Sequence, residues 1–281
     1  MTLLAQNALA SRRILVTGGA SGLGLAMGRG FLALGADLVI CGRRAELLEE
    51  VQRELGQAHP GRVETITCDI RNPDAVEQMM EQAFARRPMD VLVNNAAANF
   101  IAQTESLSPR AADAILGTTL HGALYCTLAA GKRWISQKTP GVVLSILSTS
   151  TITGRAFTVP SAMAKSGLLS MTRSLAVEWG PRNIRLVAIA PGAFPTAGAT
   201  AQLNPSTRDQ RSLDRIPLGR TGRHEELADL AAFLVSDAAG YMTGEMVVLD
   251  GGAHLRSSGA DDLVGWSDER WEEHRNQLKR R

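Results

Sequence analysis

The stretch Ile14-Leu-Val-Thr-Gly-Gly-Ala-Ser-Gly-Leu-Gly-Leu-Ala-Met-Gly28 decides the fold. Its aliphatic start, Ile14 to Thr17, is typical of a buried strand, and after Gly18, Gly22 and Gly24 apolar residues recur at helical spacing. Glycines between a strand and a helix leave bare backbone N–H groups at the helix N-terminus, which stabilise an anion. The stretch therefore predicts a dinucleotide-binding turn, although glycine turns also serve plain strand-to-helix connections.

The next predicted strand carries the signal for the cofactor. It runs from Asp37 to Cys41 and leads into Arg43 and Arg44, about 20 residues after the glycine turn, where the adenosine ribose of a dinucleotide lies. A carboxylate at this place is typical of NAD binding, whereas two guanidinium groups suit the 2′-phosphate of NADP(H). We therefore predict NADP(H) as the cofactor. The alternative is that both arginines face solvent at the start of a helix.

The rest of the chain alternates strands with helices. Further strands are predicted at 63–68, 90–94, 142–147, 184–190 and 246–250, and helices at 46–55, from about 73, and at 111–137, 160–179 and 225–235. This alternation predicts an α/β fold, a parallel sheet with helices on both faces. Residues 193–222 lack a sustained period and suit a flap over a site.

The chain shows no linker-like break or repeat, so we predict a single domain over 1–281. A tail at about 256–281 resembles an appended short helix, and its Trp266 and Trp271 must pack somewhere.

Composition and charge narrow the class of protein. Hydrophobic residues make up 44% of the 281 residues and charged residues 21%, as in ordinary globular proteins, and a net charge of +2 gives no reason to expect nucleic acid or a membrane surface as partner. No run approaches the length of a transmembrane helix, and the N-terminus is too short and polar for a signal peptide. Cys41, Cys68 and Cys126 form no metal-binding pattern and indicate buried free thiols in a reducing compartment. We expect a cytoplasmic protein without a metal site.

Four landmarks then resemble the short-chain dehydrogenase/reductase family over residues 12–252. They are Thr17-Gly-x-x-x-Gly22-x-Gly24, Asn94-Asn95-Ala-Ala, the pair Ser148 and Lys165, and Pro191-Gly192. The resemblance implies a Rossmann-like doubly wound sheet and a catalytic set of Asn, Ser, Tyr and Lys. The lysine and serine places hold Lys165 and Ser148, but the tyrosine place holds Ser161 and the asparagine place holds Thr119.

Longer stretches resemble the 2,4-dienoyl-CoA reductases, a subgroup that has serine at the tyrosine place. They are Asn95-Ala-Ala-Ala-Asn-Phe-Ile101, Val159-Pro-Ser-Ala-Met-Ala-Lys165, Leu175-Ala-Val-Glu-Trp-Gly-Pro181 and Ile216-Pro-Leu-Gly-Arg-Thr-Gly-Arg223, with Trp271 in the tail. The resemblance implies an NADPH-dependent reductase of an unsaturated acyl-CoA thioester, such as a 2,4-dienoyl-CoA. It also implies a homotetramer built through the two long helices.

The resemblance also implies the site residues. In mitochondrial-type members a tyrosine and an asparagine hold the thioester oxygen, and their places fall on Ser150 and His121. The expected catalytic residues are therefore Lys165, Ser161, Ser148, Ser150 and His121. The expected cofactor-binding residues are Thr17, Gly18, Ser21, Gly22, Leu23, Gly24, Arg43, Arg44, Asp69, Ile70, Asn95, Ala96, Ala97, Lys165, Pro191, Gly192 and Phe194.

Several of these residues have a plain structural alternative. Asp69 accepts from adenine or caps the next helix, and the asparagine amides at 94–95 fix the loop or touch a ribose. Ser161 is also suited to cap a helix, His121 to helix packing, and Lys165 to a helix surface.

Two other functions compete with the dienoyl-CoA reductase hypothesis. The first is reduction of another enone or carbonyl substrate. The second is a catalytically silent NADP(H)-binding protein, because the tyrosine that protonates a carbonyl oxygen in the family is missing.

Overall fold

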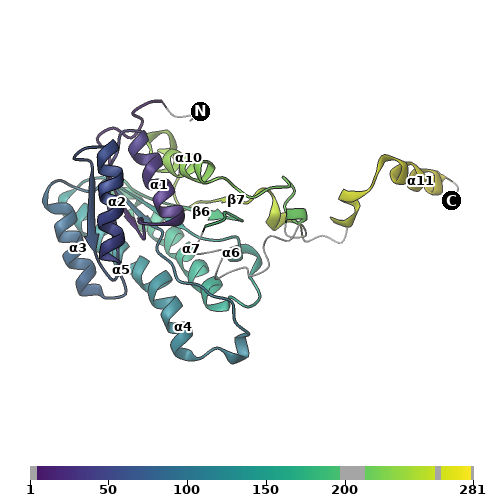
Figure 1. Cartoon of the computed structure of the whole chain (residues 1–281), viewed down its shortest axis with the longest axis horizontal. Helices are drawn as coiled ribbons and strands as arrows, with labels where there is room; N and C mark the ends of the chain where they lie inside the picture. The colour runs from purple at the N-terminus through teal and green to yellow at the C-terminus, as the bar shows by residue number, and fades with distance from the viewer. Residues whose placement is uncertain (1–4, 197–212, 257–260, 280–281) are drawn as a thin grey trace.

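A computed structural model describes residues 5–196, 213–256 and 261–279 of the chain. Seven parallel strands form one sheet in the order β3-β2-β1-β4-β5-β6-β7 (Figure 1). The strands are β1 (Arg13–Thr17), β2 (Asp37–Gly42), β3 (Val63–Thr67), β4 (Val91–Asn94), β5 (Gly141–Ile146), β6 (Ile184–Pro191) and β7 (Met246–Leu249). The order reverses at β1 and β4, which is the topological switch point of a doubly wound sheet.

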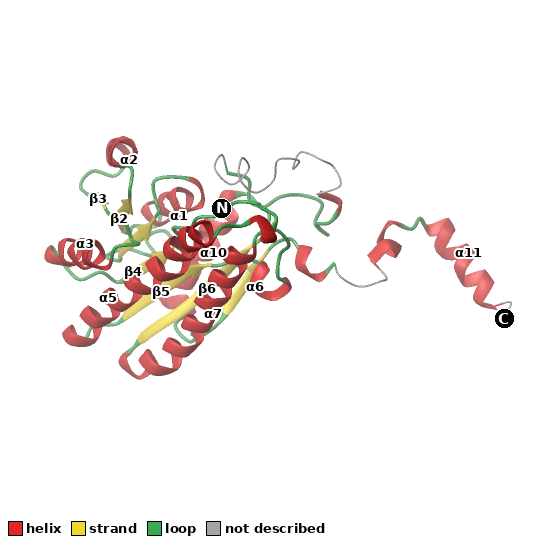
Figure 2. Ribbon diagram, turned by 90° about the horizontal axis from the view of Figure 1, so that it is seen from below, coloured by secondary structure: helices red, strands yellow, loops and turns green. Residues whose placement is uncertain are grey.

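Helices cover both faces of the sheet (Figure 2). The main helices are α1 (Gly22–Ala33), α2 (Ala45–Ala58), α3 (Pro73–Ala85), α4 (Pro109–Leu116), α5 (Gly122–Gln137), α7 (Val159–Trp179) and α10 (His224–Val235), with the short α6 (Ser150–Thr153). Side chains alternate along β1, so Ile14 joins the core layer under α1, α2 and α10, whereas Leu15 joins the layer under α3, α5 and α7. The predicted α/β fold with helices on both faces is confirmed.

The predicted helix over 111–137 begins earlier and is not uniform. It starts at Pro109, with Ser108 as its N-cap, and contains a π-helical turn at Gly117–His121 between α4 and α5. This stretch, Pro109–Gln137, is long and apolar enough to span a membrane, which the sequence expectation did not allow for. Half of its apolar window is buried in the domain, as in a helix that packs against a sheet.

All three cysteines are buried and free, as predicted. Cys41, Cys68 and Cys126 lie in the core layer under α3 and α5, and burial raises the pKa of each thiol, that of Cys68 to about 11. They are therefore protonated and unreactive at neutral pH.

The C-terminal tail extends away from the domain (Figure 1). It contains a 3₁₀ segment, Asp261–Gly265, and the helix α11, Asp268–Lys279. The rings of Trp266 and Trp271 are 4.9 Å apart, and the Arg270 guanidinium lies 4.7 Å from the centre of the Trp266 ring. The two tryptophans thus pack against each other within the tail.

Most of the predicted flap, 197–212, lies outside the described residues.

Candidate active site

The glycine turn lies between the carboxyl end of β1 and the start of α1. Gly18 and Gly22 have φ values of 63° and 54°, which side chains other than glycine rarely adopt. A Cβ on Gly24 would lie 2.5 Å from Asn95 Nδ2 and 2.6 Å from the Gly18 carbonyl oxygen, so only glycine allows the turn to close. The N-cap residue of α1, Ser21, makes no side-chain capping bond, and the first turn of α1 holds no acidic residue. Its N–H groups are therefore suited to an external anion, as a dinucleotide pyrophosphate requires.

The side chains of Thr17 and Asn95 hold this turn in place by hydrogen bonds to the backbone. The Thr17 hydroxyl donates to the Val93 carbonyl at 3.2 Å and accepts from the backbone N–H groups of Asn95 and Ala96, both at 3.0 Å. The Asn95 amide donates to the carbonyls of Thr17 at 2.9 Å and Gly18 at 3.2 Å. The Asn95 side chain thus fixes the loop, one of the two roles considered for it. Ala97 is exposed.

Four charged side chains gather where the adenosine end of a dinucleotide is expected. Arg43 and Arg44 are exposed after β2, and Arg44 Nη2 donates to the hydroxyl of Ser21 at 3.4 Å. Asp69 is held by the Arg71 guanidinium, and hydrogen bonds from Arg71 together with the nearby charge of Arg43 keep the pKa of this carboxyl below its usual value. The helix that follows is capped by Asn72, which accepts from two backbone N–H groups. Of the two roles considered for Asp69, the helix cap is therefore taken by Asn72.

The catalytic candidates Ser161 and Lys165 lie one turn apart on α7. Because α7 begins at Val159, with Thr158 as its N-cap residue, Ser161 is inside the first turn and is not the cap. Ser161 and Lys165 are 7% and 6% exposed, which excludes a surface lysine. Lys165 Nζ donates to the Ile146 carbonyl at 2.5 Å, and burial lowers the pKa of this lysine to about 8. The structure therefore holds an ammonium group at the carboxyl end of β5.

Ser148 and Ser150 follow the same strand. Ser148 is half-buried, and its hydroxyl accepts from the backbone N–H of Ser150 at 3.3 Å. Ser150 is the first residue of the short helix α6 and is 7% exposed. Both hydroxyls thus come from the loop that joins β5 to the helix carrying Lys165.

The π-helical turn holds the two candidates from the long helix. Thr119 is fully buried, and its hydroxyl accepts from the Ala98 N–H at 3.1 Å and lies 3.3 Å from the Ala98 carbonyl oxygen. It therefore ties the helix to the loop after β4. His121 is exposed, with its ring centre 6.2 Å from that of Tyr125, so it does not pack into the core of the domain and its imidazole is accessible.

Comparison with known proteins settles the family. A family model described as "Enoyl-(Acyl carrier protein) reductase" matches residues 18–254, which include the glycine turn and Lys165. The chain is a short-chain dehydrogenase/reductase. Members of this family are oxidoreductases that bind NAD(P).

The relatives of this short-chain dehydrogenase/reductase include named dienoyl-CoA reductases. The Bacillus subtilis "Probable 2,4-dienoyl-CoA reductase [(2E)-enoyl-CoA-producing]" is 41% identical over 87% of this chain and 97% of its own. A Caenorhabditis elegans "Probable 2,4-dienoyl-CoA reductase 3 [(3E)-enoyl-CoA-producing]" is 38% identical over 99% of this chain and 93% of its own. A Beutenbergia cavernae crystal structure, titled as an NAD(P)-dependent gluconate 5-dehydrogenase with bound NADP at low occupancy, superposes with a TM-score of 0.83. It is 31% identical and covers 89% of this chain and 100% of its own.

Sequence reasoning missed one pair next to the site of this short-chain dehydrogenase/reductase. Asp250 and His254 follow β7, and Asp250 accepts from the N–H and Nδ1 of His254 at 2.7 and 2.8 Å. Gly192 packs directly on Asp250, because a Cβ on Gly192 would lie 2.5 Å from the Asp250 Cβ. The signal available in the sequence was an aspartate at the end of the predicted strand 246–250 with a histidine four residues later. Phe194 is buried, and its ring packs on Gly222, which fixes both ends of the predicted flap.

Proposed function

We propose that this protein is an NADPH-dependent reductase of an unsaturated acyl-CoA thioester, most specifically a 2,4-dienoyl-CoA. The observation that carries the proposal is a buried serine, Ser161, at the place of the family tyrosine and one turn before the buried Lys165. The names of the Bacillus subtilis and Caenorhabditis elegans relatives support the substrate class. The two names differ in the product double bond, so the proposal extends only to reduction of the conjugated diene.

The preference for NADPH over NADH is proposed from the positive charges of Arg43 and Arg44. The Arg44 guanidinium contacts Ser21, the Arg43 charge lies near Asp69, and that carboxylate is already paired with Arg71. A 2′-phosphate matches this positive group better than a 2′-hydroxyl does. Bound NADPH supplies the hydride.

Each catalytic side chain then has one proposed task. The Lys165 ammonium binds the nicotinamide ribose and favours negative charge that develops nearby. Ser148, Ser150, Ser161 and His121 supply hydrogen-bond donors for the thioester oxygen as it takes up dienolate charge. A serine hydroxyl donates a hydrogen bond without giving up its proton, which suits hydride addition to carbon at the end of a conjugated system. Water provides the proton that later goes to carbon.

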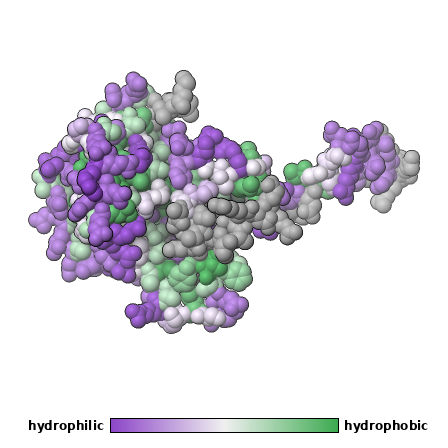
Figure 3. Space-filling model, in the orientation of Figure 1, coloured by the Kyte–Doolittle hydropathy of each residue, from purple (hydrophilic) through white to green (hydrophobic). Residues whose placement is uncertain are grey.

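An apolar rim is suited to the acyl chain. It consists of the exposed residues Ile101, Ile152, Phe157 and Met163. Figure 3 shows apolar surface in the lower part of the view, the region of α4 and α7 in Figure 1. Phe157 has a φ of 63°, which is strained for a bulky residue, and its carbonyl accepts from the Ala102 N–H at 3.0 Å. The bond ties the loop after β4 to the start of α7. We propose that this strained turn holds the rim open for an acyl chain.

We also propose a quaternary structure and a cellular location. Leu128 on α5 and Val177 on α7 are exposed apolar residues on the two helices through which a homotetramer would form. Light scattering tests the assembly, and a monomer would exclude it. Buried free thiols support a reducing compartment such as the cytoplasm.

The test is NADPH oxidation followed by absorbance with a 2,4-dienoyl-CoA and, in parallel, a 3-ketoacyl-CoA. We expect turnover of the dienoyl thioester alone, and a tenfold or greater loss of kcat in Ser161→Ala with NADPH affinity retained. The exposed Ser174→Ala on the same helix is the matched control. Turnover of the ketone alone would indicate a carbonyl reductase. Tight NADPH binding without turnover of either thioester would indicate a silent NADP(H)-binding protein.

A further inference from the structure

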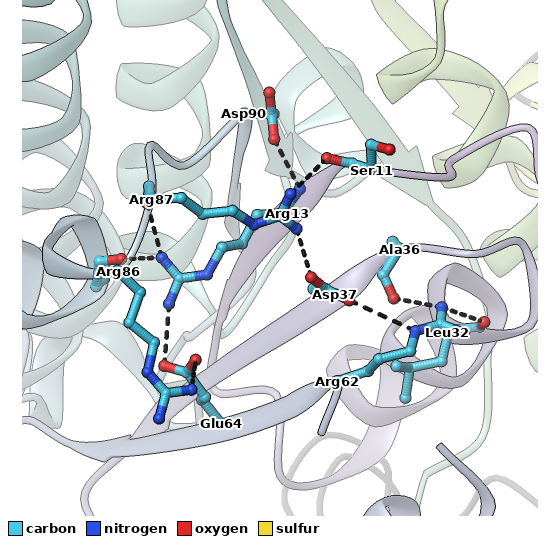
Figure 4. A network of polar contacts seen from close by, with 11 residues as sticks. Ser11, Arg13, Leu32, Ala36, Asp37, Arg62, Glu64, Arg86, Arg87 and Asp90 are labelled. Atoms are coloured by element: carbon cyan, nitrogen blue, oxygen red, sulfur yellow. Dashed lines mark hydrogen bonds and ion pairs between the residues drawn. The ribbon is translucent and has the colours of Figure 1, made fainter. Parts of the chain in front are cut away.

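A second polar site lies at the opposite edge of the sheet from the glycine turn, where β1, β2 and β3 begin (Figure 4). It is a cavity of about 180 Å³. Its charged lining residues are Arg13, Arg62, Arg86, Arg87, Asp37 and Glu64. None of the predicted catalytic or cofactor-binding residues lines it, so we treat this amino-edge arginine site as separate from the active site.

Arg13 forms the buried wall of the cavity. Its side chain is 2% exposed, and Nη1 donates to the carbonyls of Ala83 and, at 2.9 Å, Arg87, while Nη2 donates to Glu64 at 2.9 Å. A buried guanidinium with several acceptors is held in one orientation. The positive charge therefore has a fixed place in the wall.

The two carboxylates do not neutralise the four arginines. Glu64 is shared by Arg13 and Arg86, at 2.9 and 2.7 Å. Asp37 is shared by Arg62, at 3.5 Å, and by Arg87. The six charged lining residues therefore carry a formal charge of +2.

The neighbouring residues Arg12, Asp90 and Asp237 reduce this surplus but do not cancel it. Arg12 lies 3.8 Å from Asp90 and also pairs with Asp237, and the N–H of Arg13 donates to Asp90 at 2.7 Å. Counting these three residues with the lining still leaves a formal charge of +1. The described residues therefore leave a net positive charge at this site.

Arg86 has donors to offer such an anion. Its side chain is 72% exposed, and among the described residues Glu64 is its only hydrogen-bond acceptor. Arg62 and Arg87 are also part-exposed at the mouth, at 33% and 39%. The planar fork of a guanidinium matches the oxygens of a phosphate, and the cavity is several times the roughly 30 Å³ of one water molecule.

We propose that the amino-edge arginine site binds a phosphate dianion, either inorganic phosphate or a phosphate monoester. The anion neutralises the surplus charge and joins the starts of β1, β2 and β3 to the end of α3. The site does not depend on the proposed reductase activity.

The experiment is isothermal titration calorimetry on the full chain, with chloride buffer at constant ionic strength. Inorganic phosphate is titrated with and without saturating NADPH, and glycerol 3-phosphate is titrated separately. We expect one saturable site per chain when NADPH is saturating, because the cofactor then covers the anion-binding groups of its own site. Arg86→Gln should weaken binding about tenfold or more, as for one charge-assisted hydrogen bond. The control Arg53→Gln makes the same charge change on α2 outside the cavity and should leave Kd within twofold.

Three results would overturn the proposal. They are the absence of saturable binding, an equal loss in the Arg86 and Arg53 variants, and loss of phosphate binding when NADPH is present, which would place the ion in the cofactor site. Circular dichroism in chloride confirms that Arg86→Gln is folded, and partial recovery in Arg86→Lys would support a charge contact. Tighter binding of phosphate identifies the free ion as the ligand, whereas tighter binding of glycerol 3-phosphate identifies an ester.

Discussion

Replacing Lys165 by methionine should stabilise the cofactor-free protein although it removes a proposed catalytic residue. Burial of Lys165 lowers its pKa from 10.5 to about 8, which corresponds to about 3 kcal/mol of unfavourable ionisation in the folded state at pH 7. Methionine keeps an unbranched apolar side chain. The Ile146 carbonyl loses its donor, which costs about 1–2 kcal/mol. We therefore expect the free energy of unfolding to rise by about 1–2 kcal/mol.

The gain should depend on pH. Between pH 8 and 10.5 the unfolded chain binds more protons at Lys165 than the folded protein does, so wild-type stability rises with pH in this window. Below pH 8 the cost of the buried ammonium is fully present. Methionine does not titrate, so its advantage is largest at pH 7 and falls by about 2 kcal/mol toward pH 10.

Urea unfolding at pH 7 and pH 10, followed by tryptophan fluorescence at one protein concentration, measures both effects. The control is Lys132→Met, because this lysine is 74% exposed and 3.9 Å from Glu77, and its replacement should change stability by less than about 0.5 kcal/mol. A Lys165→Met variant that is less stable than wild type at pH 7, or whose difference from wild type is the same at both pH values, would refute the reasoning. Turnover should be lost in either case.

Three further substitutions test the cofactor side of the site. Arg44→Ala should raise KM for NADPH about tenfold or more with little effect on KM for NADH, and equal effects on both would argue against a 2′-phosphate contact. Asn95→Ala leaves the carbonyls of Thr17 and Gly18 without their donor, so urea unfolding should show a loss of about 2–4 kcal/mol, with weaker NADPH binding in fluorescence titration. Gly192→Ala should cost about 1–3 kcal/mol because its Cβ overlaps Asp250, and a neutral melting temperature would contradict the packing.

The fold could be predicted because the local sequence patterns of the strands and helices all indicated the same architecture. The alternation of Ile14, Leu15 and Val16 already places successive side chains on opposite faces, and the structure puts them in two core layers. Strands separated by helices must be parallel, so the glycine turn, Ser148 and Pro191 had to meet at one edge of the sheet. Sequence spacing was enough for this part of the site.

Side-chain contacts between residues far apart in the chain could not be predicted from the sequence in this way. Asp69 and Asn72 are both good caps, and only the position of Arg71 decides that Asp69 is taken up by a salt bridge. The pairing of Arg13 with Glu64 joins residues 51 positions apart, and no local pattern marks it. Such side-chain choices follow from the packed structure and not from propensity.

The chemistry of the site follows from what replaces the family tyrosine. Ser161 and Lys165 are four residues apart on α7 and therefore share one face of the helix, where both are buried. A serine hydroxyl lowers the energy of a negative oxygen by donating a hydrogen bond, but it is too weak an acid to protonate an alkoxide at neutral pH. The Lys165 ammonium adds charge stabilisation in a site where burial strengthens electrostatic interactions. We therefore expect such a site to favour a transition state whose negative charge is spread over a conjugated thioester, and to disfavour reduction of an isolated ketone. The dienoyl-CoA and ketoacyl-CoA assays therefore test this difference in chemistry directly.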